Sequence, residues 1–128
     1  MYNAKIVRAP TIPSAEKAIR AIGVSEDCVR IMHSKAVFRL IKLKNVRNAV
    51  ANILKQEMLS SGGDATVSRW TVDCSRQKTD VLLMGTAKQL ERVIVKMRMQ
   101  SQGLLPEKKK EYLSLSDELR AVLKKSLG

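Results

Sequence analysis

The sequence is poor in aromatic residues, cysteine and histidine, and each shortage excludes a class of function. Its 128 residues include one Phe, one Trp, two Tyr, two Cys and one His. Two cysteines cannot build the disulfide framework of a small secreted protein, so we expect Cys28 and Cys74 to be small buried residues. Together with His33 they supply too few ligands for a metal site, and we expect no metal. The packing must come from Val, Ile, Leu and Met.

Long apolar runs are also absent. The longest are as short as Val81–Met84, whereas a membrane helix needs about 20 apolar residues. The first ten residues, MYNAKIVRAP, lack the apolar block of a signal peptide. We therefore expect a cytoplasmic protein without a membrane span. The length predicts one α+β domain over residues 1–105, followed by a linker and a C-terminal helix over residues 106–128.

Charge is the strongest compositional signal. The chain has 24 Lys and Arg against 12 Asp and Glu, a formal net charge of +12. A surface of this kind attracts polyanions or an acidic partner over a long range. The alternative is that the charge only keeps the surface solvated.

The hydrophobic pattern of the first half predicts alternating short elements. Pro10 and Pro13 end the first strand, Gly23 closes the first helix, and Asn45 caps the long helix. The expected elements are a strand over 3–8, helices over 14–22 and 25–32, a strand over 36–43, and a helix over 46–59 that ends at Gly62 and Gly63.

The second half continues with two strands and two helices. Val81–Met84 is apolar on both faces, which is typical of a central strand. Thr86 and Gln89 match a capping box, so a helix should begin there. The expected elements are a strand over 64–72, a turn over 73–79, a strand over 80–84, a helix from 86 to about 100, a linker over 103–110 and a helix over 114–125.

This order of elements predicts an α+β fold of the split β-α-β, ferredoxin-like kind. Helices would lie mainly on one face of a mixed sheet, with the C-terminal helix added. In a permuted version, residues 3–8 would serve as an edge strand.

Two surfaces are candidate binding sites. At the strand-to-helix junction, Gly85, Thr86 and Lys88 would present helix amides and a cation to an anion, although an ordinary helix cap explains the same residues. A nucleic acid could instead run along five cations, although too few aromatic residues accompany them to form a stacking platform. These cations are Lys42, Lys44, Arg47, Arg69 and Arg76.

No pattern of catalytic residues is present. A lone histidine such as His33 is more often structural than catalytic. Asp64, Asp73 and Asp80 lie near predicted strand ends, but their spacing matches no motif, and turns and caps explain them. We expect no catalysis by this chain on its own and no cofactor.

Three segments carry a family resemblance. They are ANILKQEMLS at 51–60, GGDA at 62–65 and TDVLLMGT at 79–86. In order and spacing they resemble the extra N-terminal domain that precedes the catalytic barrel in dihydropteroate synthases of many anaerobic bacteria. The resemblance covers roughly residues 20–105. The sequence departs from that family around Val67–Trp70 and Gln100–Gly103, where the family has proline and glycine.

The resemblance implies a role beside an enzyme. Dihydropteroate synthase joins a dihydropterin pyrophosphate to p-aminobenzoate, and its catalytic residues lie in a (β/α)8 barrel of about 250 residues. No position of this chain matches the barrel's motifs, so no catalytic residue carries over. The resemblance therefore implies a non-catalytic accessory or interaction domain of pterin and folate metabolism, with a pterin-binding barrel protein or another acidic protein as partner. The alternative is a basic nucleic-acid-binding domain.

Overall fold

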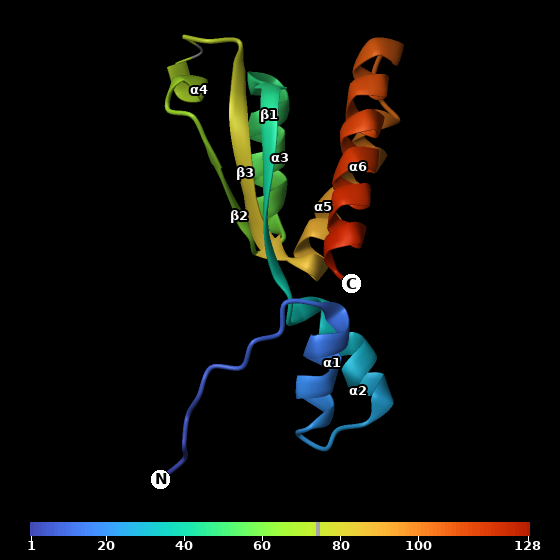
Figure 1. The fold of residues 1–128 in the computed structure, drawn as a ribbon. Coiled ribbons are helices and arrows are strands. Elements are labelled where there is room, and N and C mark those ends of the chain that lie inside the picture. The colour runs from blue at the N-terminus through green and yellow to red at the C-terminus, as the bar shows by residue number, and fades with distance from the viewer. Residues whose placement is uncertain (74) are drawn as a thin grey trace.

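The computed structural model describes residues 1–73 and 75–128, except for the side chain of Val72. The expected burial of Cys74 lies outside these residues. Three strands form one sheet with helices packed on one face (Figure 1). In chain order the elements are α1 Ile12–Arg20, α2 Glu26–Met32, the 3-10 helix η1 His33–Lys35, β1 Phe38–Arg47, α3 Asn48–Ser60, β2 Asp64–Val67, α4 Trp70–Asp73, β3 Lys78–Thr86, α5 Ala87–Ser101 and α6 Pro106–Ser126.

The sheet confirms the α+β fold and the split β-α-β arrangement. Its strand order is β1-β3-β2, and β3 pairs antiparallel with both neighbours. Strands β1 and β2, which α3 connects, therefore run in the same direction with β3 inserted between them. All pairs of neighbouring strands are antiparallel in the described residues, where a mixed sheet was expected.

Strand β3 is central, as the apolar run at 81–84 predicted. Val81 and Leu83 point toward the helices and are 1% and 0% exposed. Leu82 and Met84 point to the opposite face and are only half-buried. The run is therefore apolar on both faces, but the helices of this chain cover only one of them.

The core lies between that covered face and helices α3, α5 and α6. Its apolar side chains come from all three strands and all three helices. The buried members of this core are Ile41, Leu43, Val46, Val50, Ala51, Leu54, Met58, Ala65, Val81, Leu83, Leu90, Val93, Ile94, Met97, Tyr112, Leu119 and Leu123.

Helix α3 ends at glycine, as predicted. Gly62 has φ +93°, a left-handed conformation that costs glycine little. The Gly63 amide then donates to the Met58 carbonyl at 2.9 Å, which satisfies one of the last carbonyls of the helix. Gly63 also lies close to β3, because a Cβ there would be 2.6 Å from the Met84 carbonyl oxygen.

The predicted start of α3 at Asn45 is wrong. Asn45 has φ +56° at an irregularity of β1 between Leu43 and Val46, and its amide donates to Asp80 Oδ1 at 3.2 Å. A bulge of this kind takes up an extra residue and lets pairing resume. Strand β1 therefore continues to Arg47, which occupies the N-cap position.

The predicted strand over 3–8 is also wrong. These residues form no strand and pair with none in the described part of the chain, and Ile6 and Val7 are 93% and 59% exposed. The first helix begins earlier than expected, because Thr11 and Ser14 form a capping box ahead of the predicted Ser14 cap. The permuted version of the fold therefore does not apply.

Strand β2 stops at Val67, short of the predicted residue 72. The Ser68 amide donates to Thr79 Oγ1 at 2.9 Å, so a side chain takes the place of the next ladder bond. The chain then turns into the short helix α4, where Trp70 Nε1 donates to the Lys78 carbonyl at 3.2 Å.

Helix α6 begins at Pro106, so the predicted linker over 103–110 is wrong from that residue onward. Proline suits the first helical turn, where its missing amide proton costs nothing. Tyr112, Leu119 and Leu123 bury the inner face of α6, and Ser116 Oγ lies 3.3 Å from the Ile94 carbonyl oxygen of α5. The division into a domain over 1–105 and a segment over 106–128 stays a prediction.

Two arginines fasten α6 to β1. Arg47 donates to both carboxylate oxygens of Glu111, at 2.8 and 2.7 Å, and Arg39 donates to Ser126. The hydrogen bonds from Arg47 hold the pKa of Glu111 below its ordinary value. Because the arginines act at opposite ends of β1, α6 is held at both of its ends.

Substituting Gly63 with alanine should destabilise the fold. The added Cβ would meet the Met84 carbonyl oxygen at 2.6 Å and Met58 Cε at 2.7 Å. We expect G63A to lower the free energy of unfolding by about 1–3 kcal/mol in a denaturant titration. Gly103 has no atom within 4 Å of such a Cβ, so G103A should stay within about 0.5 kcal/mol of the parent. Equal stability of G63A and G103A would contradict the close contact.

The Arg47–Glu111 pair should make stability depend on pH. A carboxyl group whose folded pKa is lowered stabilises the fold fully above its unfolded pKa, and this contribution is lost as the pH falls through the folded pKa. Because both side chains are partly exposed, we expect E111Q to cost only about 0.5 kcal/mol at pH 7. That difference from the parent should shrink in acid. The matched control is E118Q, at an exposed glutamate of the same helix. A difference for E111Q that grows in acid would contradict the assignment.

Candidate interaction surface

The uncovered face of the sheet carries an apolar centre. Leu40 of β1 is paired in register with Met84 of β3, and Lys42 with Leu82, so these four side chains share that face. Phe38 extends the same row on β1. Neighbouring strands thus place three large apolar side chains of the sheet next to one another, with Phe38 at one end.

These side chains are more exposed than a core would allow. Phe38 and Leu40 are 58% and 61% exposed, and Leu82 and Met84 are half-buried. Contiguous apolar side chains on a monomer surface commonly mark a site that contacts another molecule. We define the open face as Phe38, Leu40, Leu82 and Met84, with Lys42 at its border.

Polar residues border the open face. A shallow hollow beside Leu82 is lined by Lys42, Thr66, Ser68 and Asp80. Lys42 and the nearby Lys44 are exposed and form no ion pair in the described residues. An apolar centre with a polar and partly cationic border is the usual layout of a protein-binding surface.

The carboxylates that could have served catalysis have structural partners. Asp64 accepts the Ala65 amide at 2.7 Å, and this hydrogen bond lowers the pKa of Asp64. Asp73 accepts the Ser75 amide at 2.9 Å, which likewise lowers its pKa. Asp80 accepts the Asn45 amide. A general acid needs a raised pKa, so Asp64 and Asp73 are poorly suited to that role.

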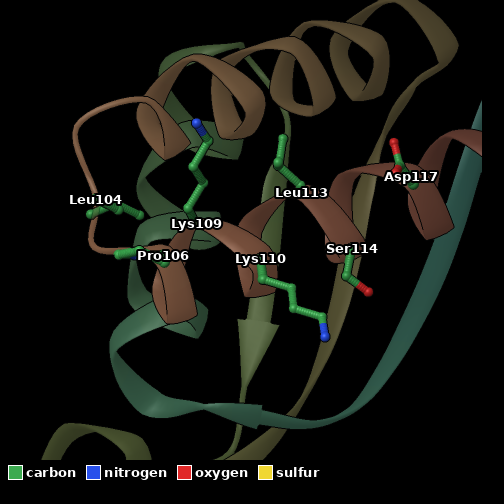
Figure 2. A pocket seen from close by; sticks show the side chains of 7 residues that line it. All are labelled: Leu104, Pro106, Lys109, Lys110, Leu113, Ser114 and Asp117. Carbon is green, nitrogen blue, oxygen red and sulfur yellow. The ribbon is translucent and has the colours of Figure 1, made fainter.

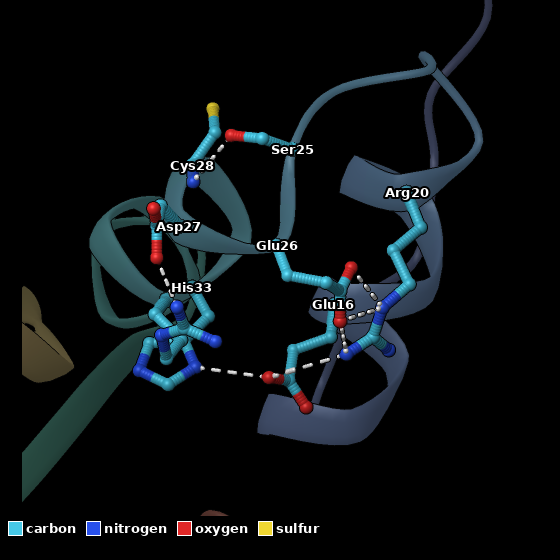
Figure 3. A network of polar contacts seen from close by, with 8 residues as sticks. Glu16, Arg20, Ser25, Glu26, Asp27, Cys28 and His33 are labelled. Atoms are coloured by element: carbon cyan, nitrogen blue, oxygen red, sulfur yellow. Dashed lines mark hydrogen bonds and ion pairs between the residues drawn. The ribbon is translucent and has the colours of Figure 1, made fainter.

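His33 belongs to a polar network at the N-terminal helices (Figure 3). Its Nδ1 lies 3.2 Å from Glu16 Oε2, and Arg20 lies between Glu16 and Glu26. The hydrogen bonds from Arg20 lower the pKa of Glu26. Cys28 has a free, partly exposed thiol near this network, where a buried residue was expected. The network ties α1 to α2 and to η1.

Several backbone amides at the predicted anion site, at the start of α5, donate to groups of the protein itself. Thr86 and Gln89 form the predicted capping box, with the Thr86 amide donating to Gln89 Oε1 at 2.9 Å and the Gln89 amide donating to Thr86 Oγ1 at 3.2 Å. The Ala87 amide donates to the Val37 carbonyl at 2.8 Å. Gly85 is buried against Gln89, and Lys88 is half-buried. Anion binding at Gly85, Thr86 and Lys88 stays a prediction, which these internal hydrogen bonds do not favour.

The structure brings two of the five predicted nucleic-acid contacts together, because Arg47 and Arg76 line one pocket. Lys42 lies at the open face and Lys44 is exposed two residues further along β1, whereas Arg47 is also bound to Glu111 on α6. The guanidinium of Arg76 lies 4.3 Å from the ring centre of Trp70, and Arg69 is exposed beside α4.

The described part of the chain has neither a metal-ligand cluster nor a membrane-spanning helix. No group of three or more His, Cys, Asp or Glu side chains is placed to hold a metal ion. None of the helices there combines the length and the apolar character needed to cross a membrane.

The sequence did not lead to a prediction of the open face. The signal was present, because Val81–Met84 is apolar on both faces of its strand and Phe38 and Leu40 share one face of theirs. Such a pattern is typical of a strand that is buried on both sides. In a three-stranded sheet with all its large helices on one side, the same pattern leaves one apolar face open.

Comparison with known proteins gives two relatives. Over 99 residues the chain is 33% identical to the bifunctional dihydropteroate synthase/dihydropteroate reductase of Helicobacter pylori, a match that covers 77% of this chain and 26% of that protein. Over 118 residues it is 30% identical to a probable bifunctional folylpolyglutamate synthase/dihydropteroate synthase of Halobacterium salinarum, covering 92% of this chain and 13% of that protein. No family model and no solved structure matches. The chain is thus similar to a minor part of two proteins whose names both include dihydropteroate synthase.

Proposed function

We propose that this chain is a non-catalytic accessory domain of pterin and folate metabolism, which acts in the cytoplasm by binding a dihydropteroate synthase barrel. The observation that carries the proposal is the similarity to 26% and 13% of two larger proteins, both of which have this enzyme in their names. The matched part corresponds, in this proposal, to the extra domain that precedes the barrel. In this proposal the chain works by contact with the catalytic part.

The open face is the contact surface in this proposal. Phe38 and Leu40 are more than half exposed, so a partner that buries them gains roughly half of the 1.5–3 kcal/mol that complete burial of each side chain contributes. Lys42 and Lys44 at the border would meet carboxylates of the partner, which favours encounter and orientation more than affinity.

The carboxylates and the histidine considered for catalysis have structural partners in the described residues, which agrees with a non-catalytic role. The Asp64, Asp73 and Asp80 carboxylates each accept a backbone amide, and His33 is paired with Glu16. These groups hold turns and helices in place, and they lie on different elements.

Nucleic-acid binding is the second candidate function. The exposed Lys42 and Lys44 on an open sheet face favour it, because a sheet face can carry a single strand. Phe38 is the one aromatic side chain on that face in the described residues, and a stacking platform needs more. A protein partner fits Leu40, Leu82 and Met84 better.

The docking proposal predicts a complex that depends on the open face. The purified chain should bind the catalytic barrel of a dihydropteroate synthase from the same organism in isothermal titration calorimetry. The double variant F38S/L40S should weaken binding by at least about tenfold, because two apolar contacts are lost. The matched control is L59S, which changes a leucine of α3 that is 51% exposed. Absence of a complex, or equal binding by F38S/L40S and the parent, would refute docking through this face.

The same preparations separate the remaining alternatives. The chain alone should show neither dihydropteroate synthase nor dihydropteroate reductase activity, and either activity would refute the non-catalytic role. Labelled single-stranded RNA and DNA should show no binding near physiological salt. Binding that is lost in K42A/K44A and falls steeply with salt would favour the nucleic-acid function instead.

A further inference from the structure

A groove follows the exposed side of the contact between α5 and α6. On α5 its lining includes Val95 and Met99, and on α6 it includes Leu113, Arg120 and Lys124. Val95 and Arg120 line both halves of the groove, so it is continuous along the helix pair. Near the start of α6 it adjoins a hollow where Lys109 and Leu113 lie close to Leu104 and Pro106 (Figure 2).

Accessible apolar side chains lie along the floor of the groove. Val95 and Met99 are 47% and 63% exposed, and their spacing of four residues places them on one stripe of α5. Leu113 and Leu127 of the opposite side are half-buried. Apolar side chains in such a row match the i, i+3, i+4, i+7 anchors of an amphipathic helix lying in a groove.

The rim of the groove is basic. Lys109, Arg120 and Lys124 line it and form no ion pair with any described residue, whereas Arg98 is bound to Asp117. Among the described lining residues of its two halves, Glu91 is the one carboxylate. Exposed cations beside an apolar floor favour a ligand that is apolar on one side and acidic on the other.

We propose that the groove between α5 and α6 binds an acidic amphipathic helix of a partner protein. From Lys109 to Leu127 the groove runs for about 27 Å at 1.5 Å per residue, which accommodates a helix of roughly five turns. A second copy of this chain is a poor occupant, because its net charge of +12 would repel the basic rim. The proposal stands on the groove alone and does not depend on the proposed role in folate metabolism.

A designed peptide tests this groove directly. The probe is a fluorescein-labelled helical peptide of 18 residues with leucine at i, i+3, i+4 and i+7 and glutamate on both flanks. Fluorescence anisotropy should show saturable binding of this peptide to the full chain. A counterpart peptide with lysine in place of every glutamate should not bind. The charge-reversal variant R120E/K124E should weaken binding of the acidic peptide by at least about tenfold.

Two further variants separate a groove from general attraction between opposite charges. K5E/R8E makes the same change in net charge in the exposed N-terminal segment, and it should alter binding by less than about twofold. M99E should weaken binding about as much as R120E/K124E, because it places a carboxylate on the apolar floor. Circular dichroism should show each variant folded. No binding of the acidic peptide, or an equal loss in K5E/R8E and R120E/K124E, would overturn the proposal.

Discussion

The packing of β3 against the helices is the interaction on which the rest of this structure depends. Val81 and Leu83 are buried under α3 and α5, and side chains alternate along a strand with a period of two. Their burial therefore turns Leu82 and Met84 to the opposite face. A shift of one residue would bury Leu82 and Met84, but it would also bring Asp80 toward the core, so the register is well specified. The open apolar face is a direct consequence of the way the core is built.

Gly62 and Gly85 are closely packed against neighbouring side chains. The segments that contain them therefore stabilise the fold and leave little room for a ligand. A Cβ at Gly62 would meet Gln89 Nε2 at 2.9 Å, and one at Gly85 would meet Met58 Cε at 2.9 Å. The end of α3, the end of β3 and the start of α5 thus meet around two side chains, Met58 and Gln89. Gln89 also accepts the Thr86 amide. The Ala87 and Gln89 amides, which would otherwise donate to an anion at this helix start, donate to the Val37 carbonyl and to Thr86 Oγ1.

The sequence predicted those parts of the fold that depend on local chemistry and periodicity. The Thr86–Gln89 capping box, the Gly62 helix stop and the central position of Val81–Met84 are all observed. The predictions were wrong where residues distant in the sequence determine the local structure. Asn45 is a residue type that often caps helices, but here it lies in a bulge, where Asp80 of the neighbouring strand accepts its amide. Residues 3–8 have strand character, but no strand of the described residues lies beside them. The open face was missed for the same reason, because pattern alone cannot tell whether a second layer exists.

The basic residues of the chain fall into two groups. Some form ion pairs within the fold, and others form none among the described residues. Arg47 is bound to Glu111, Lys96 to Glu57 and Arg98 to Asp117, so these cations connect elements within the fold. Lys42 and Lys44 border the open face, and Arg120 and Lys124 border the groove between α5 and α6. An attraction spread evenly over the surface would not distinguish one acidic partner from another. Cations beside exposed apolar side chains can do so, because a partner must then supply carboxylates and apolar groups at matching positions. The net charge thus becomes selective only where it borders an apolar surface.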